Sequence, residues 1–339
     1  MKKRVCIIYT GGTIGMMPTE NGYAPNPKAF PELLDKIHDI NLPDFPSYEV
    51  VLMDRLLDSS DVGYREWCEI GKIIRDRYDE YDGFVVLHGT DTMAYTASAL
   101  SFILEGLNKA VVFTGSQIPL CRMRSDGTDN LVSSILVAAS GEVREVCIYF
   151  GGELMRGNRA TKVSADDLKA FASPNYPRLA DVGTSIVYRK KFLYRQEDLP
   201  LNLVELSPIP IAVIKMFPGF SAPLVRSLVG SGVRAIVLEA FGAGNIPSSN
   251  ELSVALTEAV ESGAVIVVTS QCGRGNVAIG TYQTSQMLKK MGAVSGFDMT
   301  TEAAVAKLYY LFSRYGEDTE RVKALMESDL RGEVSFDER

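Results

Sequence analysis

Short apolar runs alternate with segments of helical spacing along the first half of the chain. The runs are apolar on both faces, as in strands that are covered on two sides. This alternation favours a mostly parallel sheet with helices on both faces. The predicted strands here are Val5–Tyr9, Phe84–Leu87, Ala110–Phe113 and Val146–Phe150, and the predicted helices are Trp67–Tyr78, Met93–Leu107 and Asn130–Ala139.

The alternation is interrupted once and then resumes. Residues 188–210 are polar and contain Pro200, Pro208 and Pro210, which predicts a linker. We therefore predict two α/β domains with mostly parallel sheets, the larger amino-terminal one flavodoxin-like. The predicted boundaries are 1–188, a linker at 189–210, and 211–339. Predicted strands after the linker are Ile211–Met216, Ala235–Leu238 and Val265–Thr269, and predicted helices are Pro223–Leu228, Glu251–Glu261, Tyr282–Met291, Thr301–Arg314 and Glu317–Ser328.

Composition indicates a soluble globular protein. Of the 339 residues 46% are hydrophobic and 23% are charged, which are ordinary fractions for such proteins. The apolar run near the start covers only Val5–Tyr9, shorter than the roughly 7–15 residues of a signal-peptide core. We therefore expect a cytoplasmic protein that contacts no membrane.

The spacing of the cysteines, the number of histidines and the net charge argue against several classes of function. The five cysteines are widely spaced without a C-x-x-C pair, which argues against a disulfide framework or a zinc site. With His38 and His88 as the only histidines, a Ser-His-Asp triad is hard to assemble. The net charge is −7 and no basic run occurs, so we expect no nucleic-acid partner.

Polar, glycine-rich segments follow the predicted strands, and ligands in such sheets bind beyond the carboxyl ends of the strands. Thr10–Gly15 comes directly after the first strand and places the hydroxyl of Thr13 on a glycine turn. A phosphate-binding turn is the alternative interpretation. The segment lacks the G-x-G-x-x-G and G-K-[ST] patterns, which weakens that alternative.

Two further segments offer a hydroxyl, a carboxylate and an amine. Thr90 and Asp91 follow the strand that ends at Leu87, and a threonine nucleophile needs a partner that accepts its proton. Lys162 is either a solvated surface charge or, beside Thr90, a base. Asp91 or Thr92 alternatively caps the next helix, and for Thr92 we favour the cap.

The loop Asp58–Asp61 carries two hydroxyls and two carboxylates. It is either part of a binding site or a helix cap, supplied by Asp61, for the segment that contains Trp67.

Taken together, these segments resemble the bacterial-type L-asparaginase family over nearly the whole chain. LDSSD at Leu57–Asp61 and the GNRATK segment resemble its type I, cytoplasmic branch. The segments similar to family signatures are TGGTIG at Thr10–Gly15, LHGTDTMAYTASALSF at Leu87–Phe102, TGSQIP at Thr114–Pro119, RSDGTDNL at Arg124–Leu131 and RGNRATK at Arg156–Lys162.

The resemblance implies hydrolysis of L-asparagine to aspartate and ammonia through a threonine acyl-enzyme, without a metal or organic cofactor. It also implies a homo-oligomer, a dimer or a dimer of dimers, with sites shared between subunits. The implied roles are acyl-enzyme formation for Thr13, a lid for Tyr23, activation for Thr90, Asp91 and Lys162, substrate binding for Asp58, Ser59, Ser60, Gly89 and Ser116, and a reach into the neighbouring subunit's site for Asn245.

A second asparagine site between subunits is a feature of some cytoplasmic members, and Thr161 and Cys272 lie in matching loops. Glu239 departs from this pattern, because a carboxylate effector requires a basic residue at that strand end. The simpler interpretation of Cys272 is a small buried residue after a strand.

Two alternative functions use the same fold. The asparaginase-like subunit of a tRNA-dependent amidotransferase carries an extra amino-terminal domain and needs basic surface, whereas this chain begins with the first strand and is acidic. An amino-acid sensor would keep the pocket without turnover. The sensor is disfavoured by the presence of all five matching residues, Thr13, Tyr23, Thr90, Asp91 and Lys162.

Overall fold

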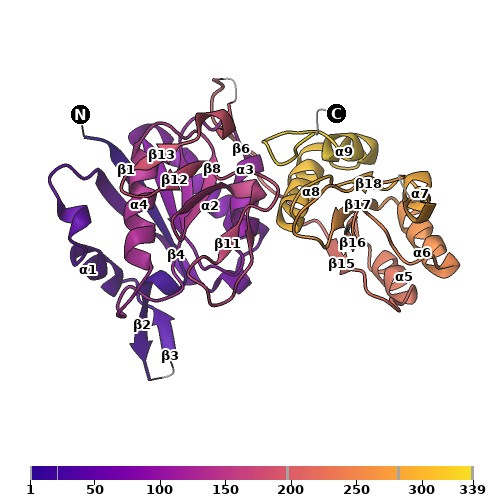
Figure 1. The fold of residues 1–339 in the computed structure, drawn as a ribbon, viewed down its shortest axis with the longest axis horizontal. Helices are drawn as coiled ribbons and strands as arrows, with labels where there is room; N and C mark the ends of the chain where they lie inside the picture. Colours follow the sequence, from indigo (N-terminus) through magenta and orange to yellow (C-terminus); the bar gives the residue numbers. More distant parts are fainter. Residues whose placement is uncertain (1, 21, 196–197, 281–282, 337–339) are drawn as a thin grey trace. The chain divides into compact units, whose positions relative to one another are not determined.

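The computed structural model describes residues 2–20, 22–195, 198–280 and 283–336, and the chain divides into two compact units (Figure 1). The first comprises Met1–Ser173 and Pro177–Val204, and the second comprises Pro174–Tyr176 and Glu205–Arg339. Each unit contains its own sheet with parallel strands and its own helices. The predicted fold class, α/β with a larger amino-terminal part, is confirmed.

The sheet of the first unit is mostly parallel at its centre. β4, β1, β5, β7 and β8 run parallel to one another, whereas β9, β12 and β13 extend the sheet as antiparallel strands. In spatial order, the eight strands of this sheet within the described residues are β13 (Ile186–Tyr188), β12 (Ala180–Val182), β9 (Glu153–Arg156), β8 (Val146–Phe150), β7 (Val111–Thr114), β5 (Gly83–Leu87), β1 (Arg4–Gly11) and β4 (Ser47–Leu57).

The order of the five parallel strands determines where a ligand can bind. Numbered along the sequence as parallel strands only, they follow the order 2-1-3-4-5, which is the flavodoxin-like arrangement. The strand order reverses between β1 and β5, because β4 lies on one side of β1 whereas β5, β7 and β8 lie on the other. β1 and β5 pair in parallel from Val5↔Gly83 to Tyr9↔Leu87. A ligand crevice is therefore expected beyond the carboxyl ends of β1 and β5.

Burial explains why these strands form. Every residue of β5, β7 and β8 is buried, because α3 (Met93–Ile103) packs on β7 and β8 while α4 (Gly127–Ala139) packs on β1, β5 and β7. The helix predicted to reach Leu107 ends at Ile103, since Leu104 and Glu105 form β6 and pair with β14 (Asn202–Leu203).

Shorter elements complete the first unit. The β2–β3 hairpin separates β1 from α1, and β10 pairs with β11 near the end of the segment that follows β9. Their bounds are β2 (Met16–Thr19), β3 (Gly22–Pro25), α1 (Ala29–Asp35), α2 (Tyr64–Asp76), β10 (Thr161–Lys162) and β11 (Phe171–Ala172), with short 3-10 helices η1 (Thr13–Gly15), η2 (Asp39–Asn41), η3 (Ser59–Asp61), η4 (Tyr78–Glu80), η5 (Gly157–Arg159) and η6 (Lys190–Phe192).

The second unit contains a smaller, wholly parallel sheet in the order β15-β16-β17-β18. The helix predicted from Tyr282 is α7, although Tyr282 itself lies outside the described residues. The bounds are β15 (Ile211–Lys215), β16 (Ala235–Ala240), β17 (Val265–Ser270), β18 (Val294–Ser295), α5 (Pro223–Gly230), α6 (Asn250–Glu261), α7 (Gln283–Lys290), α8 (Thr301–Tyr315) and α9 (Thr319–Met326).

Candidate active site

The loops after β1 and β5 touch through their backbones. Gly12 has a φ of +83°, and a Cβ at this position would lie 2.6 Å from the backbone nitrogen of Gly89. A left-handed φ and this close approach both require glycine. The contact places Thr13, the half-buried first residue of η1, next to the loop that carries Thr90.

The loop after β4 joins them. A Cβ on Gly89 would lie 2.6 Å from the hydroxyl of Ser59, and the Thr92 hydroxyl donates to the Ser59 carbonyl at 2.6 Å. Since β4, β1 and β5 are adjacent parallel strands, their carboxyl ends deliver all three loops to one edge. The structure thus brings Asp58–Ser60 to the same place as Thr13 and Thr90.

Lys162 links the second hydroxyl to a carboxylate. Its Nζ donates to Thr90 Oγ1 at 2.9 Å and to Asp91 Oδ1 at 2.6 Å. Its side chain is only 18% exposed, and β10 holds it opposite Phe171. The structure thus brings Thr90, Asp91 and Lys162 together, and the alternative of a solvated surface charge does not fit the burial of Lys162.

The loop after β7 closes the other side of Thr90. Ser116 is buried, and its hydroxyl has no hydrogen-bond partner among the described residues. The next residue, Gln117, accepts a hydrogen bond from the Thr90 hydroxyl at 3.3 Å. Sequence reasoning quoted TGSQIP but overlooked Gln117, although its place at a strand end was an available signal.

Asp126 fixes this loop from the start of α4. Its carboxylate accepts the backbone N–H groups of Gln117, at 3.0 Å, and of Ile118, at 2.9 Å. The side chain of Asn130 donates to Asp126 and to the Gly115 carbonyl. The motif Arg124–Leu131 therefore holds the loop, which the sequence analysis did not predict.

His88 was also missed, since it entered the sequence analysis only as a scarce histidine. It is fully buried, and burial lowers the pKa of its imidazole to about 4, so the ring is neutral at pH 7. Nδ1 lies 2.7 Å from the Gly89 carbonyl oxygen, and Nε2 lies 3.0 Å from Thr96 Oγ1. A carbonyl oxygen only accepts hydrogen bonds, so Nδ1 carries the proton.

Tyr23 occupies the β2–β3 hairpin and is 43% exposed. Its hydroxyl accepts a hydrogen bond from Arg122 Nη1 at 3.1 Å, and the guanidinium lies 5.8 Å from the ring centre. The contacts of Tyr23 thus lead to Arg122 rather than to Thr13.

Two predicted helix caps are wrong. α2 begins after Gly63, whose N–H donates to the Glu66 side chain at 2.8 Å, so Glu66 rather than Asp61 satisfies this helix start. Thr92 occupies the N-cap position of α3 without a side-chain cap bond, because its hydroxyl donates to Ser59 instead. Asp58 caps η3 by accepting the Ser60 N–H at 2.9 Å.

Of the remaining predicted residues, one lies in the first unit and two lie in the second. Thr161 pairs with Ala172 across β10 and β11 in the first unit. Asn245, in the second unit, lies in a turn whose backbone pairs with Phe241. Cys272 is exposed, so its interpretation as a small buried residue is wrong. Its N–H donates to Ser270 Oγ at 3.0 Å.

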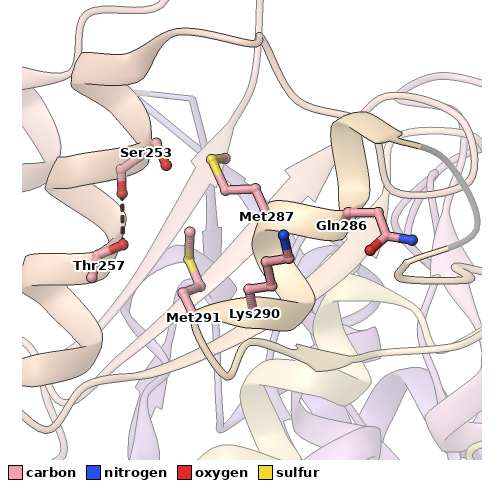
Figure 2. Close-up of a pocket in the computed structure, with 6 residues that line it drawn as sticks. All are labelled: Ser253, Thr257, Gln286, Met287, Lys290 and Met291. Carbon is pink, nitrogen blue, oxygen red and sulfur yellow. Dashed lines mark hydrogen bonds between the residues drawn. The ribbon is translucent and has the colours of Figure 1, made fainter.

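The second unit also carries a separate cavity of about 720 Å³ between α6 and α7, shown in Figure 2. The Thr257 hydroxyl on its wall donates to the Ser253 carbonyl. None of the site residues predicted from the sequence lines this cavity. Its lining consists of Ser253, Thr257, Gln286, Met287, Lys290 and Met291.

Two family models together match most of the chain. The family model described as "Asparaginase, N-terminal" matches residues 4–194, and the one described as "Glutaminase/Asparaginase C-terminal domain" matches residues 210–326. The chain belongs to the asparaginase family.

Two relatives named L-asparaginase match over nearly their full length, and a third relative matches over part of its length. "L-asparaginase 1" of Escherichia coli (strain K12) is 43% identical over 337 residues, which cover 99% of each chain. The crystal structure of L-asparaginase I from Vibrio cholerae has a TM-score of 0.92 and 41% identity, covering 99% of this chain and 100% of that one. The human "60 kDa lysophospholipase" is 38% identical over 98% of this asparaginase-family chain and 62% of its own length.

No helix in the described ranges is long and apolar enough to span a membrane. Within the same ranges, no group of three or more His, Cys, Asp or Glu side chains is arranged to hold a metal ion.

Proposed function

We propose that this asparaginase-family chain is an L-asparagine amidohydrolase that uses a threonine nucleophile. The observation that carries the proposal is the Lys162 Nζ bridge between Thr90 Oγ1 and Asp91 Oδ1. The bridge lies beside the Gly12–Thr13 turn, at the edge of the sheet where the strand order reverses. Full-length similarity to asparaginases supports the same assignment.

The proposed reaction has two steps. The Thr13 oxygen attacks the side-chain amide carbon of asparagine, the C–N bond breaks, and ammonia leaves with the proton that the hydroxyl gave up. A water molecule then cleaves the resulting ester to release aspartate. Thr90, Asp91 and Lys162 move the proton, because the Lys162 amine lies within hydrogen-bond reach of Thr90 Oγ1.

Stabilisation of the oxyanion falls to backbone N–H groups. His88 Nδ1–H holds the Gly89 carbonyl, and in a trans peptide the N–H of the next residue points the opposite way. The Thr90 N–H therefore faces away from His88, and we infer that it is one of the oxyanion donors. Removal of one such donor typically costs about 10²–10³ in rate.

Substrate selection is assigned to the loops around this centre. Asp58 offers a carboxylate to the α-ammonium group of the substrate, and Ser59, Ser60 and Gly89 face its α-carboxylate. Ser116 has a free buried hydroxyl for the amide. We infer a preference for asparagine over glutamine from the type I resemblance.

Assembly and location belong to the same proposal. Tyr23 acts as a lid, and Asn245 serves the site of a neighbouring subunit in a cytoplasmic homodimer or dimer of dimers. Light scattering tests the assembly, and a monomeric mass at micromolar concentration would exclude it. An effector site at Thr161 and Cys272 is a weaker part of the proposal, since Glu239 accepts a hydrogen bond from Thr301 at 2.6 Å and offers no cation.

The first experiment measures ammonia release from asparagine and from glutamine. We expect saturable release with asparagine and a kcat/KM on glutamine at least tenfold lower. Thr13→Ala and Thr90→Val each remove a reacting hydroxyl and are expected to reduce kcat by at least 10³ with unchanged circular dichroism. Asparagine binding by calorimetry without ammonia release would instead identify a sensor.

A further inference from the structure

Gln117 presents a defined end of its amide to Thr90. Its Nε2 donates to the carbonyl oxygens of Ala165, at 3.0 Å, and Asp167, at 3.2 Å. Two carbonyl oxygens can only accept, so the end of the amide that faces them must be the NH₂ group. The oxygen Oε1 is therefore the end that meets the Thr90 hydroxyl at 3.3 Å.

The backbone of Gln117 is equally constrained. Its N–H points to both oxygens of Asp126, at 3.1 and 3.0 Å, and Asp126 is itself held by Asn130. A side chain anchored at its amide nitrogen and at its backbone has little freedom to move Oε1. The position of Oε1 is thus set by the loops around it rather than by Thr90.

The single proton of the Thr90 hydroxyl determines the role of Gln117 Oε1. The hydroxyl has one proton and accepts a hydrogen bond from Lys162 Nζ at 2.9 Å. When Lys162 is the donor, the hydroxyl proton points to Gln117 Oε1. When Lys162 is neutral and takes that proton, the hydroxyl must rotate away from Gln117 and the 3.3 Å bond is lost.

We propose that Gln117 is a positioning residue that holds the Thr90 proton away from Lys162 and so sets the pH at which the pair becomes active. This inference rests on the proposed amidohydrolase function. Gln117 touches no reacting atom of the substrate and acts through Thr90. It favours the resting pair, in which Lys162 is protonated, over the active pair, in which Lys162 accepts the proton.

Other titratable groups lie near the pair or near Gln117. Asp91 contacts Lys162 directly, and Asp126 contacts the Gln117 backbone. Asp166 accepts from Ser164 Oγ and Asp167 accepts from the Lys169 N–H, both within their own turn. His88 is neutral above about pH 5, because its pKa is lowered to about 4.

The test compares pH profiles of kcat/KM for ammonia release by the full chain. Gln117→Met keeps the side-chain length but removes Oε1, so the rising limb should move to lower pH by at least half a unit. Gln117→Glu adds a negative charge within reach of the Lys162–Thr90 pair and makes the lysine proton harder to remove. Its rising limb should move to higher pH by about one unit.

Asn108→Asp is the matched control. It makes the same amide-to-carboxylate change just before β7, at the opposite end of the strand that leads to Gln117. Asn108 bonds Asp198 and Arg144 at the surface, and its variant should keep the wild-type profile. Thermal unfolding of each variant establishes that it is folded.

The outcomes separate this inference from the function on which it rests. An active wild type with opposite shifts for the two Gln117 variants supports the positioning role. An active wild type whose profile stays in place in both folded variants overturns that role and leaves the amidohydrolase intact. A wild type that releases no ammonia overturns the proposed function itself, and this inference with it.

Discussion

His88 acts on the site through the single proton that its neutral ring carries. The proton sits on Nδ1 and holds the Gly89 carbonyl at 2.7 Å, while Nε2 faces Thr96 Oγ1. Thr96 also receives a hydrogen bond from the Trp67 indole N–H. The orientation of the Gly89–Thr90 peptide thus depends on a buried chain of hydrogen bonds that reaches α2.

This burial predicts a specific pH dependence of stability. The pKa of His88 is about 4 when folded, against 6.5 for an exposed histidine, so the unfolded chain binds more protons between these values. Stability must therefore fall as pH falls through that window. Between pH 7.5 and pH 5 the His88 contribution to the free energy of unfolding should decrease by about 2 kcal/mol.

Urea unfolding at the two pH values measures this contribution. His88→Asn keeps a donor for the Gly89 carbonyl but does not titrate, so its loss between pH 7.5 and pH 5 should be smaller than that of wild type by about 2 kcal/mol. The same change at exposed His38 is the control. Equal pH dependence in wild type and His88→Asn would show that the buried ring does not govern acid stability.

Loops behave as coupled elements, because the backbones of Gly12 and Gly89 are in contact. Gly12→Ala combines a positive φ with a Cβ 2.6 Å from a backbone nitrogen that cannot move aside cheaply. Gly141 also has a positive φ, of 72°, but its added Cβ would meet nothing within 4 Å. The pair therefore separates the cost of strain from the cost of the clash.

Gly141→Ala should cost about 1 kcal/mol through strain alone. Gly12→Ala should cost about 3 kcal/mol or more and reduce kcat at least 100-fold, since the loop that carries Thr13 must shift. Chemical denaturation and ammonia release provide the two readouts. Similar losses in both variants would mean that the two loops are not in contact in solution.

Strands with a uniform apolar run were predictable from the sequence, and strands without one were not. β5, β7 and β8 are buried on both faces, and their runs appear directly in the sequence. β4 (Ser47–Leu57) was missed because it is an edge strand with Glu49, Asp54 and Arg55 among its apolar residues. The hairpin β2–β3 and the antiparallel strands β9 and β12 also lack a continuous apolar run, and β13 has only three residues.

The spacing of residues along the sequence could not predict the long-range contacts of the site. Thr90 and Lys162 are 72 positions apart, and nothing in their local sequences states that they meet. The family resemblance supplied that pairing. Strand order explains only the meeting of Thr13 and Thr90, whose loops follow the adjacent parallel strands β1 and β5. Gln117 and His88 were not predicted from the sequence, because each acts through a neighbouring residue rather than on the substrate.

At the scale of the whole molecule, the carboxyl-terminal unit is secured by an ion pair without solvent contact. Lys307 of α8 and Glu333 are 2.5 Å apart, and both side chains are fully buried. Burial lowers the pKa of Lys307, and burial alone would raise the pKa of Glu333, but the neighbouring ammonium lowers it. Glu333 also accepts the backbone N–H groups of Leu330 and Arg331, which ties the end of the chain to α8.

Breaking this pair should destabilise the second unit strongly. Lys307→Met leaves a buried carboxylate without its cation and should cost about 3–5 kcal/mol. The double variant Lys307→Met, Glu333→Leu removes both charges and should recover at least half of that loss. Calorimetric unfolding of the three proteins checks this, and a double variant no more stable than the single would indicate that packing, not charge, is decisive.

The glycine contact between the strand ends also limits how the enzyme's substrate range can change. Neither turn has room for one extra carbon, so variation that enlarges or reshapes the specificity pocket cannot begin at Gly12 or Gly89. It must begin in the segments that surround them, Asp58–Ser60 and Ser116–Gln117. Mutational libraries aimed at longer amides should therefore yield folded, altered enzymes from those two segments and only inactive protein from the two glycines.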